Sequence, residues 1–147
     1  MFRKHQVASA AIMPVSKVAE PAFRENVLDK MSNDKMSLIA RNDSEICLYG
    51  QRMYKKYGKH RHQHQYIRQE MRQLARFLNS ARAVDSSVLT LQDCIDSTKF
   101  SVCVEAVKNL CGYDSKEMTF TTPSLAKKIG HACQSCETDE DQIMKTW

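Results

Sequence analysis

The 147-residue chain is poor in the residues that make tight turns, because it holds only four glycines and three prolines. A β-sandwich or a barrel with many tight turns usually needs more of both, so these all-β classes are disfavoured. Aromatic residues are also sparse at 7%, yet hydrophobic residues reach 42% and charged residues 27%. This mixture can bury a core and leave a solvated surface, and it favours one helical domain.

Long hydrophobic runs are lacking as well. The weakly apolar stretch at residues 7–15 is interrupted by Ser9 and closed by Pro14. It is far shorter than the roughly 20 residues that a bilayer span needs, and it makes a poor signal peptide. We therefore expect residues 1–20 to form a disordered lead-in, and we expect no membrane partner.

The six cysteines are even in number but do not resemble a disulfide framework. Cys47, Cys103 and Cys111 fall on the apolar stripes of predicted helices, where a free thiol behaves as a small buried hydrophobe. Disulfide scaffolds are shorter and richer in cysteine and in turns. We expect free thiols and a reducing compartment, which means a nuclear or cytoplasmic protein.

Apolar residues that recur three and four positions apart predict an all-α fold, a single bundle of four to five amphipathic helices over residues 21–138. The longest helix is expected over residues 65–82. Asn42 and Asp43 suit the cap of the helix before it, which ends at Gly58. The inward residues of the long helix are expected to be Ile67, Met71, Leu74, Ala75, Leu78 and Ala81.

Turn and cap residues delimit the remaining helices. Pro21 suits the first turn of a helix that runs to about Met31, whereas the apolar residues 36–40 are too few to assign. Thr90 and Asp93 resemble a capping box before a short turn. A further helix capped by Ser97 or Thr98 is expected to end at Gly112 and to bury Phe100, Cys103, Val104, Val107, Leu110 and Cys111.

The last helix is expected to begin at Pro123, after Thr122, and to end near residue 138. Its inward set would be Leu125, Ala126, Ile129, Ala132 or Cys133, and Cys136. Residues 139–147 are expected to form an acidic tail.

The net charge of +5 is unevenly distributed along the chain. Residues 1–51 carry seven basic and six acidic side chains, residues 52–82 carry nine and one, and residues 83–147 carry six and ten. Cations clustered on one face release the counterions condensed on a polyanion, so such a face favours nucleic acid. The candidate phosphate contacts are Arg52, Lys55, Lys56, Lys59, Arg61, Arg68, Arg72 and Arg76.

The basic face admits other interpretations. Arg68, Arg72 and Arg76 recur every four residues and form one ridge, with only Glu70 nearby in sequence to neutralise them. They could instead be solvated arginines that cover apolar neighbours, or they could pair with acids of the last third of the chain or with an acidic protein partner.

Two clusters contain metal-ligand residue types, but neither has the pattern of a site. His60, His62 and His64 alternate among cations that oppose a divalent ion, so we interpret them as a polar connector. Cys133 and Cys136 form a single CxxC, whereas structural zinc normally needs four ligands. We expect no metal and no cofactor.

Enzyme motifs are lacking too. The sequence contains no GxSxG, no Walker loop, no GxGxxG and no HExxH. We expect a non-catalytic module that binds nucleic acid; the alternative is a helical bundle that binds an acidic protein partner.

Four segments carry a resemblance to a known family: residues 27–31, 42–50, the run QYIRQEMRQLARFL at 65–78, and PSLAKKIGH at 123–131. The chain resembles uncharacterised animal proteins related to mobile elements, whose helical segment looks like the core-binding domain of Crypton-type tyrosine recombinases. That resemblance implies a helical domain that clamps one side of a DNA duplex, and therefore DNA rather than RNA. No His-x-x-Arg motif or tyrosine box follows, so it implies a fragment without strand-cleaving residues.

Overall fold

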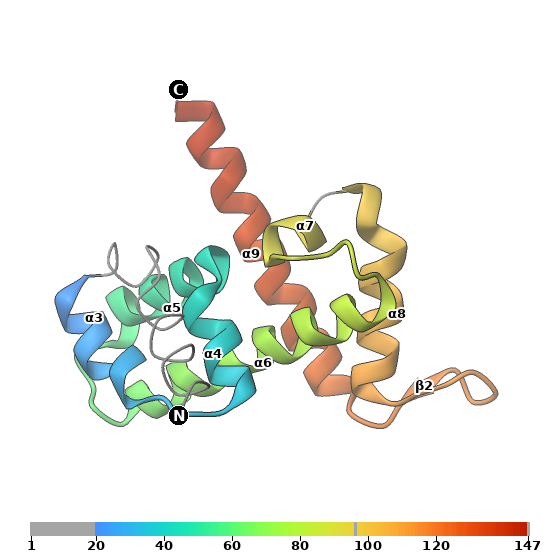
Figure 1. Cartoon of the computed structure of the whole chain (residues 1–147), viewed down its shortest axis with the longest axis horizontal. Helices are drawn as coiled ribbons and strands as arrows, with labels where there is room; N and C mark the ends of the chain where they lie inside the picture. Colours follow the sequence, from blue (N-terminus) through green and yellow to red (C-terminus); the bar gives the residue numbers. More distant parts are fainter. Residues whose placement is uncertain (1–19, 96, 147) are drawn as a thin grey trace, which may run out of the picture. The chain divides into compact units, whose positions relative to one another are not determined.

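The computed structural model describes residues 20–95 and 97–146, and side chains beyond Gln134 lie outside this description. The all-α prediction is confirmed, because the described residues are mostly helical with one two-stranded hairpin (Figure 1). The chain divides into two compact units, Met1–Ala75 and Arg76–Trp147. The boundary falls within a range that the sequence assigned to one bundle. Of the lead-in predicted for residues 1–20, residues 1–19 lie outside the described residues.

The helices of the first unit begin at well-defined caps. The Asp34 carboxylate accepts a hydrogen bond from the Ser37 N–H at 2.9 Å, and the Asp43 carboxylate accepts one from the Ile46 N–H at 3.0 Å. Each satisfies a backbone donor that a first helical turn leaves without a partner. The elements are α3 (Pro21–Asn26), a 3-10 turn (Leu28–Lys30), α4 (Lys35–Asn42), α5 (Ser44–Tyr57) and the first part of α6 (Gln63–Val84).

The core of the first unit is built from the predicted apolar stripes. In α6, Ile67, Met71 and Leu74 are buried as expected. Gly50 of α5 lies directly against Met71, because a Cβ added at Gly50 would stand 2.4 Å from the Met71 sulfur. α5 and α6 therefore approach each other closely, and a larger residue at position 50 would require the Met71 side chain to move.

The helix predicted from Pro21 to Met31 is broken. α3 ends at Asn26, and Val27, with φ of −116° and ψ of −63°, separates it from the 3-10 turn. Val27 and Leu28 are both buried.

The second unit contains the rest of α6 and the helices that follow. The Asp93 carboxylate accepts the N–H groups of Leu89 and Thr90 at 2.9 and 3.0 Å, so the predicted capping arrangement is confirmed. Gly112 ends its helix with φ of +67°, the left-handed conformation expected there. The elements are α7 (Leu91–Ile95), a 3-10 turn (Ser97–Lys99), α8 (Phe100–Cys111), β1 (Tyr113–Asp114), β2 (Thr119–Phe120) and α9 (Pro123–Thr146).

Three features of the second unit differ from the sequence predictions. Lys99, rather than Ser97 or Thr98, occupies the cap position of α8, because residues 97–99 form a 3-10 turn before the helix. The hairpin, with Tyr113 opposite Phe120, was not predicted. α9 continues to Thr146, past the expected end near residue 138.

Candidate nucleic-acid interface

Four of the eight predicted phosphate-binding residues lie together where α5 ends and α6 begins. Lys55 and Lys56 occupy the last turn of α5, and Lys59 and Arg61 lie in the link to α6. All four side chains are exposed. No acidic residue occurs between positions 46 and 69, so the acids nearest in sequence are outside this segment. We call these four residues the basic junction.

Local hydrogen bonds order the backbone of the basic junction. The Gly58 N–H donates to the Tyr54 carbonyl at 2.7 Å, and the Gln63 N–H donates to the His60 carbonyl at 2.9 Å. The His64 ring nitrogen Nε2 lies 2.8 Å from the Gly58 carbonyl oxygen. The link is therefore a sequence of hydrogen-bonded turns, and its cations are carried on an ordered backbone.

The junction cations also have a local structural role. Lys55 and Lys56 lie in the last turn of α5, near its C-terminal carbonyl groups, where positive charge is favoured by the helix dipole. The Lys56 ammonium lies 5.5 Å from the centre of the Tyr57 ring, within the range of a cation–π contact. Neither arrangement removes the charge, so both lysines still present it to solvent.

Arg68 is occupied by partners within the first unit. Its Nη1 donates to the Asn26 carbonyl at 2.9 Å, and its Nε and Nη2 donate to the Gln65 side-chain oxygen at 3.1 and 2.8 Å. Partial burial lowers the pKa of the Arg68 guanidinium. Arg68 therefore connects α6 to the end of α3, and its three guanidinium nitrogens already have partners within the protein.

Arg72 is neutralised internally. Its Nη1 lies 2.6 Å from an Asp34 carboxylate oxygen and also donates to the Ser32 and Ser37 hydroxyls at 2.7 and 2.9 Å. The Ser37 N–H and then the Arg72 guanidinium hold the pKa of Asp34 well below its usual range. The expected ridge of three like arginines is therefore not a single solvated surface. Sequence patterns do not indicate this pair, because its partners are 38 positions apart in the chain.

The two remaining candidates, Arg52 and Arg76, are not part of the basic junction. Arg52 is half-buried and already has an interaction within the protein. Arg76 is exposed and is the first residue of the second unit. The structure thus leaves Lys55, Lys56, Lys59 and Arg61 exposed within seven positions of the chain, and it gives Arg68 and Arg72 structural partners.

The described histidines and cysteines that were considered as metal ligands contact aromatic rings or are free thiols. The His60 and His62 rings lie 5.6 Å apart, while the His64 ring packs against Tyr54. Within the described part of the chain, no three His, Cys, Asp or Glu side chains are grouped so that they could hold a metal ion. Cys47, Cys94, Cys103, Cys111 and Cys133 are free thiols, and the side chain of Cys136 lies outside the description.

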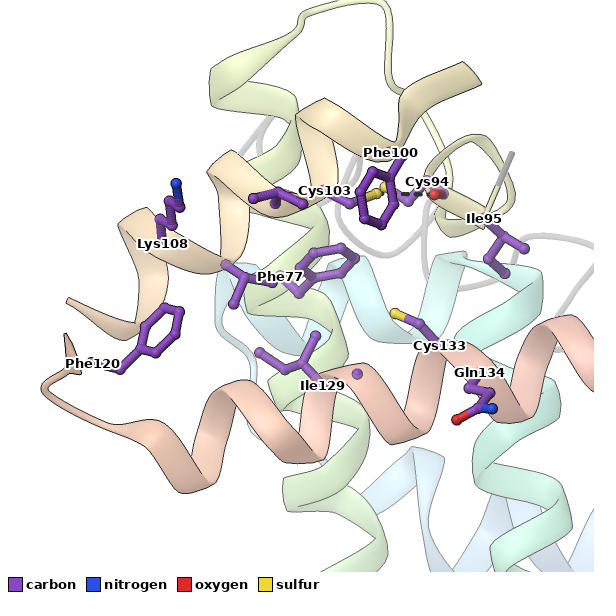
Figure 2. Close-up of a pocket in the computed structure, with 13 residues that line it drawn as sticks. Phe77, Cys94, Ile95, Phe100, Cys103, Lys108, Phe120, Ile129, Cys133 and Gln134 are labelled. Carbon is purple, nitrogen blue, oxygen red and sulfur yellow. Dashed lines mark hydrogen bonds between the residues drawn. The ribbon is translucent and has the colours of Figure 1, made fainter. Parts of the chain in front are cut away.

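A second surface feature lies in the second unit and was not anticipated. The apolar stripe of α8 was expected to be buried, but Phe100 is 72% exposed and Val104 is 36% exposed. Both line an open groove between α8 and α9, together with Phe77 of α6 (Figure 2). Of the six residues predicted to face inward on α8, Cys111 is the one that is buried, whereas the fully buried Ala106 was not predicted. Periodicity could not tell whether a neighbouring helix would cover the predicted face.

Within residues 20–95 and 97–146, no helix has both the length and the apolar character that crossing a bilayer requires. The chain matches no protein-family model, and searches of curated proteins and of solved structures return no match.

Proposed function

We propose that this chain is a non-catalytic module that binds the phosphate backbone of nucleic acid through the basic junction. The observation that carries the proposal is the set of four exposed cations, Lys55, Lys56, Lys59 and Arg61, on an ordered backbone without an intervening acid. Phosphate contacts of this kind give affinity and position but do not specify a base sequence. The free thiols support a reducing compartment, nucleus or cytoplasm, as the place where it acts.

We propose duplex DNA, rather than RNA, as the ligand. The support is the resemblance of the helical segment to the core-binding domain of Crypton-type recombinases. On that basis the chain would be a DNA-clamping part of a transposon-derived protein. Comparing the affinities for DNA and RNA duplexes of equal length tests this choice.

Removing the basic junction should abolish most binding. We expect the variant Lys55→Gln, Lys56→Gln, Lys59→Gln, Arg61→Gln to bind duplex DNA more weakly on every sequence. Each phosphate contact contributes about 0.9 to the slope of log affinity against log salt, so the slope should fall by up to about 3.6. Gel-shift or anisotropy titrations over a salt series measure both quantities.

A matched control separates the junction from net charge. Lys30, Lys35, Lys116 and Lys127 are exposed and lie outside the junction, so changing all four to Gln removes the same formal charge. This control should retain most of the salt slope. Equal losses in both variants, or no binding by the unmodified chain, would refute the proposal.

The alternative is a helical module that binds an acidic protein partner through the same cations. An acidic peptide without phosphates, such as polyglutamate, distinguishes the two ligands. If polyglutamate binds as tightly as DNA of equal charge, the acidic protein becomes the favoured partner.

A further inference from the structure

The groove of the second unit has the size of a small-molecule site. It has a volume of about 780 Å³, and ligand pockets typically measure roughly 300 to 1,000 Å³. α8 forms one wall and α9 the other, while Phe77 of α6 lies between them (Figure 2). All of its lining residues belong to the second unit.

The lining is apolar and partly open to solvent. Phe77 and Ile129 are almost fully buried, at 1% and 2% exposure, and form the base of the groove. Phe100 stands at the rim with most of its ring exposed. Gly130 leaves further space over α9, because a Cβ added there would meet no atom within 4 Å. A site of this kind gains free energy when an apolar ligand removes the rings from water.

Both ends of the groove are bounded by side chains. Phe120 of the hairpin stands at one end, and Ile95 of α7 lies toward the other (Figure 2). A partner helix continues beyond the residues that it buries and is better suited to a groove with open ends. A groove limited in this way favours a ligand of finite length.

The ends differ in charge. Lys108 is the one residue with a full charge among the described residues of the lining, which includes no carboxylate. Its ammonium lies 4.8 Å from the centre of the Tyr113 ring, and that ring packs 5.0 Å from the Phe120 ring. The cation therefore belongs to the hairpin end. Lys127 is exposed three residues before Gly130, so it follows the same face of α9 toward that end.

We infer that this groove binds a single-chain aliphatic carboxylate, with its carboxylate at Lys108 and its chain extended past Phe77 toward Phe100. The apolar lining fits the chain, and the cation without a competing acid fits the anionic end. This site is independent of the proposed nucleic-acid binding, because the basic junction belongs to the first unit.

Two substitutions on the full chain test the inference, with laurate as the probe below its micelle concentration. Gly130→Phe should weaken laurate binding at least about tenfold, because the ring would occupy the space of the chain. Ser124→Phe, which adds the same ring at an exposed residue of α9 outside the groove, is the matched control and should bind like the unmodified protein. Calorimetric titration gives the affinities, and circular dichroism verifies that both variants are folded.

The role of Lys108 at the charged end of the groove is tested by comparing laurate with an uncharged alcohol of the same chain length. Lys108→Gln should weaken laurate binding about tenfold, as expected for loss of one charge-assisted hydrogen bond, but should leave dodecanol binding unchanged. Cys103 supplies an independent signal, because its half-exposed thiol lines the groove and donates to the Cys94 carbonyl at 2.9 Å. Bound laurate should slow its alkylation by maleimide.

Three outcomes would overturn the inference: no saturable laurate binding, equal laurate affinities for Gly130→Phe and Ser124→Phe, or Lys108→Gln weakening laurate and dodecanol alike. Tighter binding of an acidic amphipathic helical peptide than of laurate, also blocked by Gly130→Phe, would reassign the groove to a protein partner.

Discussion

At the scale of single residues, Asp34 combines two tasks. It caps α4 by accepting the Ser37 N–H, and it forms an ion pair with Arg72. Both interactions favour the carboxylate, so its pKa is lower in the folded chain than in the unfolded one. The associated stability is present above the unfolded pKa of about 3.9 and is lost as pH falls toward the folded value.

Substitutions at Asp34 should separate the cap from the charge. Asp34→Ala removes both and should lower the free energy of unfolding by about 1 to 2 kcal/mol at neutral pH. Asp34→Asn retains an acceptor for the cap and should lower it less. Urea unfolding between pH 7 and pH 3 should show a weaker pH dependence for Asp34→Asn than for the unmodified chain. Parallel pH profiles would show that the ion pair adds nothing.

Residues near each other in sequence were predictable, and distant pairs were not. Asp43 and Gly112 occupy the cap positions that the sequence assigned to them. Arg72 was expected to face solvent, because sequence spacing can only count acids within one or two turns of the same helix. Its actual partner, Asp34, becomes a neighbour only after α4 packs near α6.

At the scale of elements, the connection from α8 to α9 depends on Gly112. Its φ of +67° costs an L-residue energy, and a Cβ there would stand 2.7 Å from the Thr121 hydroxyl oxygen. The Thr121 N–H donates to the Gly112 carbonyl at 2.9 Å, which closes the base of the hairpin. The conformation of one glycine thus determines where the hairpin begins.

Alanine at two glycines should have opposite effects on stability. Gly112→Ala should lower the free energy of unfolding by at least about 1 kcal/mol, because the left-handed conformation and the contact with Thr121 both oppose a Cβ. Gly130→Ala should raise it by up to about 1 kcal/mol, because Gly130 lies within α9 with open space around it. Urea midpoints measured in one buffer compare the two. A change of the same sign in both would contradict this interpretation.

Helix positions were predictable where periodicity was long and caps were present. α6 follows its predicted stripe, with Ile67, Met71 and Leu78 buried. The hairpin was missed because each strand has only two residues, too few for an alternating pattern. The groove was missed because periodicity identifies an apolar face without identifying what covers it.

At the scale of the whole molecule, the basic side chains of residues 52–82 fall into two groups, those with partners inside the protein and those exposed to solvent. Part of the excess in residues 52–82 is used inside the first unit, through Arg68 and Arg72. Arg52 and Arg82 are half-buried and also have partners in the protein. Arg76 and the basic junction are exposed, and the junction concentrates four cations in seven positions. The excess of positive charge can be counted from the sequence, but which cations are paired cannot, because side-chain pairing follows from tertiary packing.

Binding through this exposed charge should be insensitive to base sequence. We expect duplexes of equal length and different sequence to bind within about a factor of three of one another, because phosphates are common to all of them. Heparin, a polyanion without bases, should displace them all. Competition titrations test both statements. A tenfold preference for one duplex, or DNA that heparin does not displace, would indicate direct base recognition instead.

The close approach of Gly50 to Met71 has a consequence for oxidative damage. Oxidation would add an oxygen to the Met71 sulfur, the atom beside which even a Cβ at Gly50 does not fit. While the chain is folded, full burial protects this thioether from peroxide. Once the chain is unfolded the protection is gone, and a sulfoxide formed then would keep α5 and α6 from closing again. A chain oxidised at Met71 while unfolded should therefore refold less well until its sulfoxide is reduced.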